Sequence, residues 1–388
     1  MSTKTDYTSL AQQYGTPFYL LDKNEALRRV QQIKNYLPKN ARLCYAIKAN
    51  AFLTDFLKDE DILFEVCSPG ELSICEKIGL NPKKIIFSGV VKTLEDVKRA
   101  YSLNVNTITL ESKTHFDYLL KTVKETKNSH EQSVILRLTG GNQFGMSAKD
   151  LTELIGKIKE VPSVKIRGIH FFTGTQKKIK TIQEEIKYIE EYCTKLKSQF
   201  DLQNLEIEYG AGLPYEYFSG KDEKNNFSTI EDFSKLIENS KFDYVIELGR
   251  YIASPCAKYV TKIVDIKGDE KGYYCLIDGG INHINYFGQM MGMKLPKVEH
   301  IAQVSAFSNI QDYTVAGSLC TTADIVLRKL ALTSPAIGDL LVFDDIGAYS
   351  ITEGIYLFLS HPLPLVLCKA GEKLTVLRKS QETYILNS

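Results

Sequence analysis

Lys48 is the residue of this sequence whose position most directly suggests chemistry. It ends an apolar run, residues 44–47, that we expect to form a buried strand. Where such a strand opens into a cleft, desolvation lowers the pKa of a lysine amine and frees its neutral, nucleophilic form. A Schiff base with a carbonyl compound is the chemistry that this placement favours. By itself, however, Lys48 is also compatible with an ordinary strand-end lysine that reaches solvent.

Glycine turns follow two other apolar runs of the sequence. Gly210 and Gly212 follow one run, and Gly249 and Arg250 follow the next. Glycine leaves backbone N–H groups open to a phosphate, and Arg250 and the Thr175 hydroxyl would add further donors. A single glycine turn usually marks only a tight connection, but two turns beside an arginine predict a site for a phosphorylated cofactor.

Eight short apolar runs alternate with charge-rich helical segments along the first two thirds of the sequence. The runs are residues 41–47, 62–66, 84–87, 107–110, 133–138, 165–171, 205–209 and 243–247. This number predicts an α/β fold with a closed (β/α)8 TIM barrel, although an open doubly wound sheet would alternate similarly. In such a barrel the active site lies at the carboxyl ends of the strands, so Lys48 and Glu247 should lie at the same end.

The sequence changes character after about Ile252, where β-rich stretches replace long amphipathic helices. These stretches predict a second, C-terminal all-β domain. The strand-like segment 17–21 precedes the first barrel helix, and we expect it to pair with this β domain. We therefore predict a barrel over residues 25–255 and a β domain formed by residues 1–24 and 256–388.

The overall composition points to a cytoplasmic protein that acts on a small molecule. Lysine and arginine number 48 against 47 aspartate and glutamate residues, which predicts neither a nucleic-acid nor an anionic-membrane partner. The eight cysteines include no CxxC pair, and the first residues lack the apolar core of a signal peptide. No apolar run is long enough to cross a membrane, and no set of metal ligands stands out.

Six short motifs together resemble one known family. They are Tyr-Ala-Ile-Lys-Ala-Asn, Gly-Ile-His-Phe-Phe-Thr-Gly-Thr-Gln, Gly-Ala-Gly-Leu, Glu-Leu-Gly-Arg, Gly-Ser-Leu-Cys-Thr-Thr-Ala-Asp and Asp-Ile-Gly-Ala-Tyr. From about Thr16 to Leu367 the sequence resembles the fold-type III pyridoxal-phosphate decarboxylases. This family includes the diaminopimelate, ornithine and arginine decarboxylases and is related to alanine racemase. The resemblance implies a barrel followed by a β domain, in a head-to-tail homodimer with shared active sites.

The resemblance also implies roles for individual residues. Lys48 would form the Schiff base with pyridoxal 5'-phosphate, and Glu247 would keep the pyridine nitrogen protonated so that the ring stabilises a quinonoid intermediate. Cys320 of the partner subunit would protonate the product. The simpler interpretations are an ion pair between Glu247 and Arg250 and a small buried residue for Cys320. The remaining implied cofactor contacts are Phe172, Thr175, Gly210, Gly212, Gly249, Arg250 and Tyr349.

Departures from the family pattern bear on the substrate. Decarboxylases of basic amino acids carry an acidic residue directly after the catalytic cysteine, and here that residue is Thr321. Residues 279–287 contain no arginine of the kind that binds the distal carboxylate of diaminopimelate. Phe172 stands where a histidine usually stacks on the cofactor ring. A buried distal ammonium would lack its partner, so lysine, ornithine and arginine are poor substrates in this interpretation.

The predicted substrate is therefore an α-amino acid, or an aminoacyl group on a carrier protein or another conjugate, without a distal ammonium. Residues 279–288 and 320–324 look like the branch of the family found in secondary-metabolite pathways. Thr321, Asp324 and His283 are the predicted substrate-binding residues, although His283 also fits an ordinary loop histidine. The alternatives are a diaminopimelate or basic amino-acid decarboxylase, an amino-acid racemase, and an inactive homologue that regulates a partner.

Overall fold

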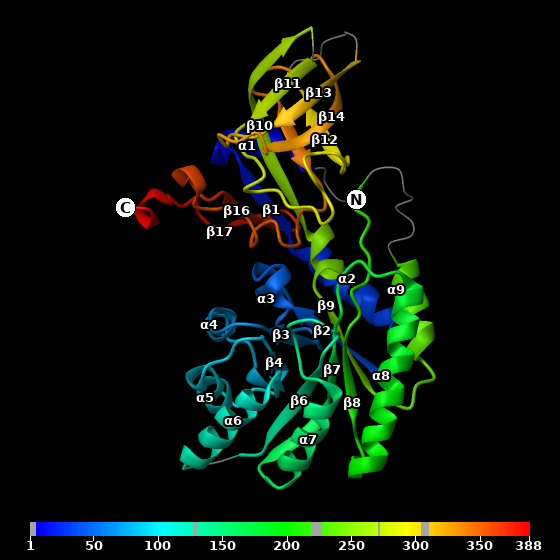
Figure 1. The fold of residues 1–388 in the computed structure, drawn as a ribbon. Helices are drawn as coiled ribbons and strands as arrows, with labels where there is room; N and C mark the ends of the chain where they lie inside the picture. The colour runs from blue at the N-terminus through cyan, green and yellow to red at the C-terminus, as the bar shows by residue number, and fades with distance from the viewer. Residues whose placement is uncertain (1–4, 128–129, 219–226, 271, 304–309) are drawn as a thin grey trace. The chain divides into compact units, whose positions relative to one another are not determined.

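The computed structural model describes residues 5–127, 130–218, 227–270, 272–303 and 310–388. Its contacts divide the chain into two compact units (Figure 1). The barrel unit consists of Arg29–Tyr215 and Glu223–Tyr251, and the β unit consists of Met1–Arg28, Glu216–Asp222 and Ile252–Ser388. The predicted division into domains near residues 25 and 255 stays a prediction.

Eight parallel strands form a closed barrel, so the predicted TIM barrel is confirmed. The strands are β2 (Ala41–Ala46), β3 (Leu63–Val66), β4 (Ile85–Phe87), β5 (Thr107–Leu110), β6 (Gln132–Leu138), β7 (Val164–Phe171), β8 (Glu206–Gly210) and β9 (Tyr244–Leu248). Each strand pairs with the next in sequence, and β9 closes the barrel on β2 with Glu247 opposite Cys44. Most strand residues are buried, which is typical of a parallel sheet covered by helices.

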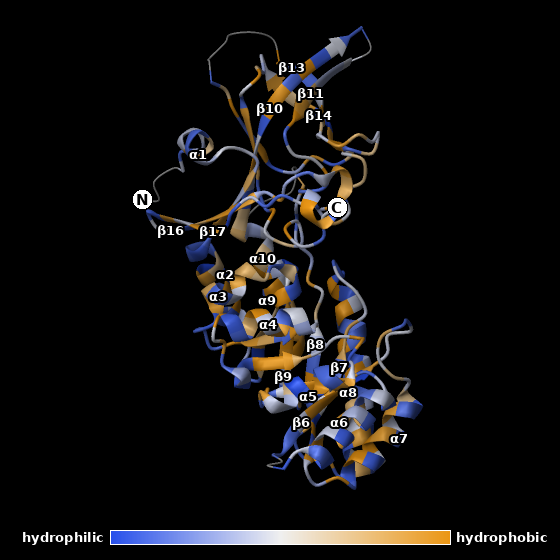
Figure 2. Ribbon diagram, turned by 90° about the vertical axis from the view of Figure 1, so that its left-hand side faces the viewer, coloured by the Kyte–Doolittle hydropathy of each residue, from blue (hydrophilic) through white to orange (hydrophobic). Residues whose placement is uncertain are grey.

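Helices surround the barrel strands (Figure 1). They are α2 (Lys23–Tyr36), α3 (Phe52–Leu57), α4 (Pro69–Lys77), α5 (Leu94–Ser102), α6 (Lys113–Glu125), α7 (Ala148–Lys159), α8 (Ile179–Phe200), α9 (Ser228–Ile237) and α10 (Arg250–Ala253). Figure 2 shows hydrophilic and hydrophobic residues side by side on α6 and α7, as expected of amphipathic helices. In α8 the buried residues recur every three or four positions, so one face packs inward. Thr93 and Asp96 form a capping box that starts α5.

The β unit contains a nine-stranded sheet in the order β14-β13-β11-β10-β1-β16-β17, with β15 on β10 and β12 on β15. Its strands are β1 (Phe18–Asp22), β10 (Ala257–Asp269), β11 (Gly272–Ile277), β12 (Val298–Ile301), β13 (Ile310–Ala316), β14 (Ile325–Thr333), β15 (Leu340–Phe343), β16 (Leu365–Ala370) and β17 (Lys373–Arg378). As predicted, the N-terminal strand β1 joins this sheet, antiparallel to β10 and parallel to β16.

A core beside β1 anchors the N-terminal segment to the β unit. Phe18 and Leu20 pack with Val260, Val342 and other buried residues. Helix α1 (Tyr7–Tyr14), which the sequence analysis did not predict, adds Tyr7 to this core. Among the described residues no helix combines the length and the apolar composition needed to cross a membrane.

Candidate active site

Lys48 lies just beyond the carboxyl end of β2, in one turn of 3-10 helix, η1 (Ile47–Ala49). Its Nζ is 2.9 Å from Oε2 of Glu65 and 3.6 Å from Sγ of Cys67. The Lys48 side chain is 41% exposed, whereas that of Glu65 is 4% exposed. Burial alone would lower the pKa of Lys48, but Glu65, Cys67 and Glu247 raise it well above its usual range. The expectation of a neutral, desolvated amine is therefore wrong, because Glu65 stabilises the ammonium form.

Three buried residues form a second group at neighbouring strands. They are His170 on β7, Glu208 on β8 and Glu247 on β9, and one potential ligand atom of each lies within 4.8 Å of the others. Nε2 of His170 is 3.4 Å from Oε2 of Glu247. Burial raises the pKa of Glu208 well above its usual range, and the negative charge of Glu247 adds to this effect. Burial opposes ionisation of Glu247 too, but interactions with His170 and Glu208 lower its pKa below the usual range.

In this group burial favours the protonated form of Glu208, whereas His170 and Glu208 favour the ionised form of Glu247. Oε1 of Glu247 has no hydrogen-bond partner among the residues that the structure describes. A buried, unpaired carboxylate oxygen is costly unless a cation or a hydrogen-bond donor binds it. His170, Glu208 and Glu247 together could bind a metal ion or a protonated ring nitrogen. Of these three residues, the sequence analysis had assigned only Glu247 to such a role.

Two loops lie in close contact beside these residues. A Cβ atom added to Gly210 would lie 2.5 Å from Cδ2 of Phe172, so glycine at this position makes room for the aromatic ring. Gly212 has a φ of +57°, and a Cβ atom there would clash with the carbonyl oxygen of Gly174. Thr175 lies in the same loop as Gly174. The loops after β7 and β8 thus place four of the predicted cofactor contacts together.

The loop after β9 is packed against the Lys48 turn. A Cβ atom added to Gly249 would lie 3.1 Å from Cβ of Ala49. Arg250 follows directly as the first residue of α10. Gly249 therefore allows close approach of the strand end that carries Glu247 to the turn that carries Lys48.

Five predicted site residues belong to the β unit. They are His283, Cys320, Thr321, Asp324 and Tyr349. Cys320 and Thr321 are exposed, and Tyr349 is partly buried with a φ of +68°. The exposure of Cys320 contradicts its simpler interpretation as a small buried residue. Six of the other seven cysteines are buried, and Cys67 is partly buried.

Asp324 and His283 are buried within the β unit. Oδ1 of Asp324 accepts a hydrogen bond from the backbone N–H of Ile281 at 2.8 Å, and Oδ2 accepts one from that of Leu319 at 2.7 Å. Nδ1 of His283 is 2.9 Å from the hydroxyl of Tyr259, and burial lowers the pKa of His283 to about 3. These contacts favour structural roles for both residues, and substrate binding by either stays a prediction.

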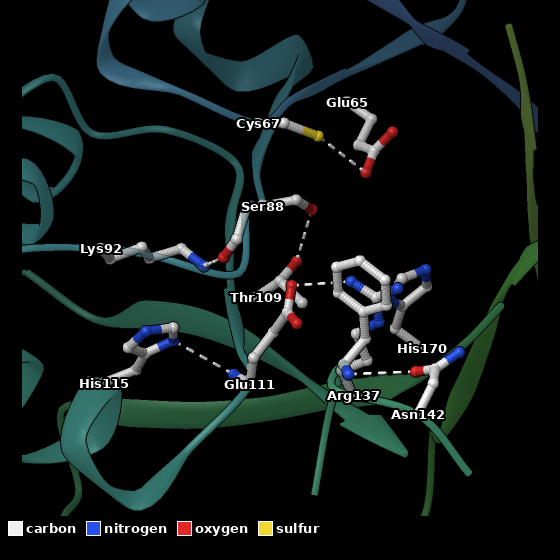
Figure 3. Close-up of polar contacts among 12 residues, drawn as sticks. Glu65, Cys67, Ser88, Lys92, Thr109, Glu111, His115, Arg137, Asn142 and His170 are labelled. Atoms are coloured by element: carbon white, nitrogen blue, oxygen red, sulfur yellow. Dashed lines mark hydrogen bonds and ion pairs between the residues drawn. The ribbon is translucent and has the colours of Figure 1, made fainter. Parts of the chain in front are cut away.

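Figure 3 shows a further buried cluster around Arg137 and Glu111, whose members were not among the predicted site residues. Nη1 of Arg137 is 2.8 Å from Oε1 of Glu111, and His115 accepts a hydrogen bond from the Glu111 backbone N–H through Nδ1. Nζ of Lys92 donates to the carbonyl of Gly89, and burial lowers the pKa of Lys92 to about 8. The lowered pKa expected of Lys48 is thus found at Lys92. Arg137 and Glu111 lie at or just beyond strand ends, where the strand-end rule places candidate site residues.

Comparison with known proteins identifies the class of protein that this fold and site define. Residues 23–254 match the family described as pyridoxal-dependent decarboxylase, pyridoxal binding domain. The chain belongs to this family. The predicted enzyme class, a decarboxylase that depends on pyridoxal phosphate, is confirmed, and so is the predicted cofactor.

Several relatives align over nearly the whole chain. L-glutamyl-[BtrI acyl-carrier protein] decarboxylase of Niallia circulans is 26% identical, covering 97% of this chain and 94% of the relative. A 2-[(L-alanin-3-ylcarbamoyl)methyl]-2-hydroxybutanedioate decarboxylase of Staphylococcus aureus is 27% identical, and the alignment covers 91% of this chain and 94% of the relative. The structure of diaminopimelate decarboxylase from Helicobacter pylori with L-lysine superposes with a TM-score of 0.85 at 21% identity, covering 98% of both chains. At this identity the superposition shows the fold alone.

Proposed function

We propose that this chain decarboxylates an α-amino acid, or an aminoacyl conjugate, whose side chain carries no distal ammonium. The observation that carries the proposal is the buried Glu247, whose pKa is lowered and whose Oε1 has no hydrogen-bond partner among the described residues. Its strand is followed by Gly249, which packs against the turn of Lys48. A carboxylate in this state fits the protonated ring nitrogen of pyridoxal phosphate. The free cysteines and the balanced charge also support a cytoplasmic location.

The residues of the barrel unit suit the cofactor in four ways. Lys48 would hold it covalently, Glu247 would pair with its ring nitrogen, and Phe172 would lie against a ring face. Thr175, Gly210, Gly212, Gly249 and Arg250 would bind its phosphate, and Tyr349 stays a predicted cofactor contact. Pyridoxal phosphate supplies an aldehyde for the lysine amine and a ring that withdraws electrons from the carbon that loses CO2. The protein's part is to hold the Glu247 charge in place and to keep the ring oriented.

We infer further that the enzyme is a homodimer in which Cys320 of the partner subunit supplies the proton for the product. The exposure of Cys320 supports this assignment, because an exposed thiol can reach a second subunit. Such a site is incomplete in a monomer.

Mixing two inactive variants tests the shared site. Lys48→Ala and Cys320→Ala chains should each be inactive, and random exchange makes half of the dimers mixed, each with one intact site. The expected activity is about a quarter of the wild-type value, measured as CO2 release. Absence of complementation under conditions where labelled subunits demonstrably exchange would contradict the shared site.

The nature of the substrate rests on Thr321. An acidic residue there would pair with a distal ammonium, and threonine cannot replace that charge. The relatives agree with this interpretation, since the name of one describes a glutamyl group on an acyl-carrier protein and that of the other an alanine unit joined to hydroxybutanedioate. Diaminopimelate decarboxylases are also among the relatives, at lower identity, and diaminopimelate is the alternative substrate.

CO2 release from a panel of substrates tests this assignment. The panel contains glutamyl-loaded acyl-carrier protein, an alanine unit amide-linked to hydroxybutanedioate, lysine, ornithine and diaminopimelate. We expect turnover of a conjugate and little of the free diamino acids. In Thr321→Glu the ratio of kcat/KM for lysine to that for the conjugate should rise about ten- to a hundredfold, since a charged pair is restored.

Other outcomes identify the alternatives. Brisk turnover of lysine, ornithine or diaminopimelate by the wild-type enzyme would show that another residue supplies the missing charge. Loss of optical activity without CO2 would indicate a racemase. A protein whose visible absorbance does not respond to borohydride, and which releases no CO2, would be an inactive homologue.

A further inference from the structure

Lys177 is a buried lysine of the barrel unit to which the proposed function assigns no role. Its side chain is 7% exposed, and its Nζ is 2.6 Å from Oε2 of Glu185 on α8. The same Nζ lies 3.2 Å from the hydroxyl of Tyr209, 3.2 Å from the carbonyl oxygen of Gly210 and 3.4 Å from Oγ1 of Thr173. Lys177 therefore connects the loop after β7, the end of β8 and helix α8.

Glu185 completes this connection from the helix side. Its Oε2 also accepts a hydrogen bond from the Tyr209 hydroxyl at 2.5 Å, and its Oε1 accepts one from Thr173. The ammonium group and the carboxylate thus lie in a network that satisfies both charges. Burial lowers the pKa of Lys177, while Glu185 opposes this effect. A buried ion pair rarely stabilises a fold more than a well-packed apolar pair of similar volume does. Stability alone therefore does not explain why Lys177 and Glu185 are paired here.

The network lies directly against the two loops that would hold the cofactor. The backbone N–H of Lys177 donates to the carbonyl of Gly212 at 2.9 Å. A Cβ atom at Gly212 would lie 2.8 Å from Cε of Lys177, so the lysine stem fills the space beside this turn. The stem and the backbone bond together fix the Gly212 turn relative to the loop after β7.

Lys177 also lies against the aromatic ring that would face the cofactor. Its Nζ is 5.9 Å from the centroid of Phe172 and 4.8 Å from that of Tyr209, within or near the range of cation–π attraction. A phenyl ring offers no hydrogen bond by which its neighbours could fix its orientation. Phe172 packs on Gly210, and the Lys177 ammonium lies at the edge of cation–π range of its ring.

We propose that Lys177, paired with Glu185, is a positioning residue of the cofactor site. It acts through Phe172 and the Gly212 turn, fixing the orientation of the ring and the spacing of the phosphate-binding loops. The inference rests on the proposed cofactor contacts of Phe172 and Gly212, and it is independent of the substrate.

Cofactor binding by the Lys177→Met variant tests this role, because methionine keeps the side-chain stem as far as the ε position and removes the ammonium group with its charge. The dissociation constant of pyridoxal phosphate, titrated into apoenzyme, should rise about tenfold or more, the loss expected when charge-assisted contacts that orient a site are removed. The visible circular dichroism of the bound cofactor should weaken, because the ring is held less rigidly. Lys180→Met is the matched control, since Lys180 is exposed on the first turn of α8, and both quantities should stay unchanged there.

A purely structural role for Lys177 would give a different result. Lys177→Met would then melt at a lower temperature but bind the cofactor with wild-type affinity and wild-type visible dichroism, and this outcome would overturn the proposal. If Lys177→Met does not fold, Glu185→Gln removes the counter-charge at constant size and is judged by the same two quantities. Because no substrate is used, an error in the substrate assignment leaves this test unaffected.

Discussion

Lys48→Ala should reduce the rate of CO2 release on the order of 10⁴-fold or more, because the residue proposed to hold the cofactor covalently is lost. The variant should still fold, since the Lys48 side chain is 41% exposed and its loss leaves no large cavity. Borohydride treatment of the cofactor-loaded wild-type enzyme should attach the cofactor to the peptide that contains Lys48. Mass spectrometry of the digested protein gives the position of the label.

Attachment of the label to Lys92 instead of Lys48 is the clearest alternative outcome of that experiment. Lys92 is a buried amine whose pKa is lowered to about 8, so reactivity ranked by pKa alone would favour Lys92 over Lys48. Geometry favours Lys48 as the residue that binds the cofactor. Glu65 accepts a hydrogen bond from its amine, and Glu247 lies close enough to raise its pKa. A label found on Lys92, with Lys48→Ala still labelled, would contradict the assignment.

Because the pKa of Lys48 is raised, the rate at which apoenzyme takes up the cofactor covalently should depend on pH. The ammonium form must lose a proton before it can react with an aldehyde, and a higher pKa makes the neutral fraction smaller at a given pH. Covalent uptake of the cofactor by apoenzyme should therefore accelerate as the pH rises through the neutral range. A rate that falls with rising pH would contradict the ammonium state of Lys48.

Glu247→Gln should lower kcat by about 10²- to 10³-fold at saturating cofactor, the loss typical when one preorganised electrostatic group is removed. The amide keeps the size of the side chain but cannot hold a proton on the ring nitrogen. The visible spectrum of the bound cofactor should change as well, because the charge beside its ring is gone. kcat and the absorption spectrum of the loaded enzyme are the quantities to measure.

Glu208→Gln is the matched control for this prediction. Glu208 is buried like Glu247, but burial raises its pKa well above the usual range, so it holds a proton more readily than Glu247 and replacement by an amide removes less charge. We expect less than about a tenfold effect on kcat, in line with loss of a neutral hydrogen-bonding group. An equal or larger loss in Glu208→Gln would show that the two carboxyl groups have the opposite roles.

The sequence by itself determined the closed barrel, the pairing of segment 17–21 with the C-terminal sheet, and the family. Apolar runs of barrel-strand length, separated by amphipathic helices, are local patterns, and the eight of them predicted the closed barrel that the structure shows. The placement of segment 17–21 with the C-terminal sheet was also predictable, because it precedes the first barrel helix. Strand ends identified Lys48 and Glu247, since residues after parallel strands meet at one end of a barrel.

Only the tertiary structure decided the charge states of the site residues. It also showed why particular residue types, such as glycine at position 210, are needed where they stand. The pKa of Lys48 is raised rather than lowered because Glu65, from the next strand, lies 2.9 Å away, and no local pattern reports that distance. The pairing of Glu208 with Glu247 and the contact of Phe172 with Gly210 likewise join neighbouring strands and loops. Electrostatic interactions and close packing depend on separation in space, so the properties of these groups follow from the folded barrel and not from their order in the sequence.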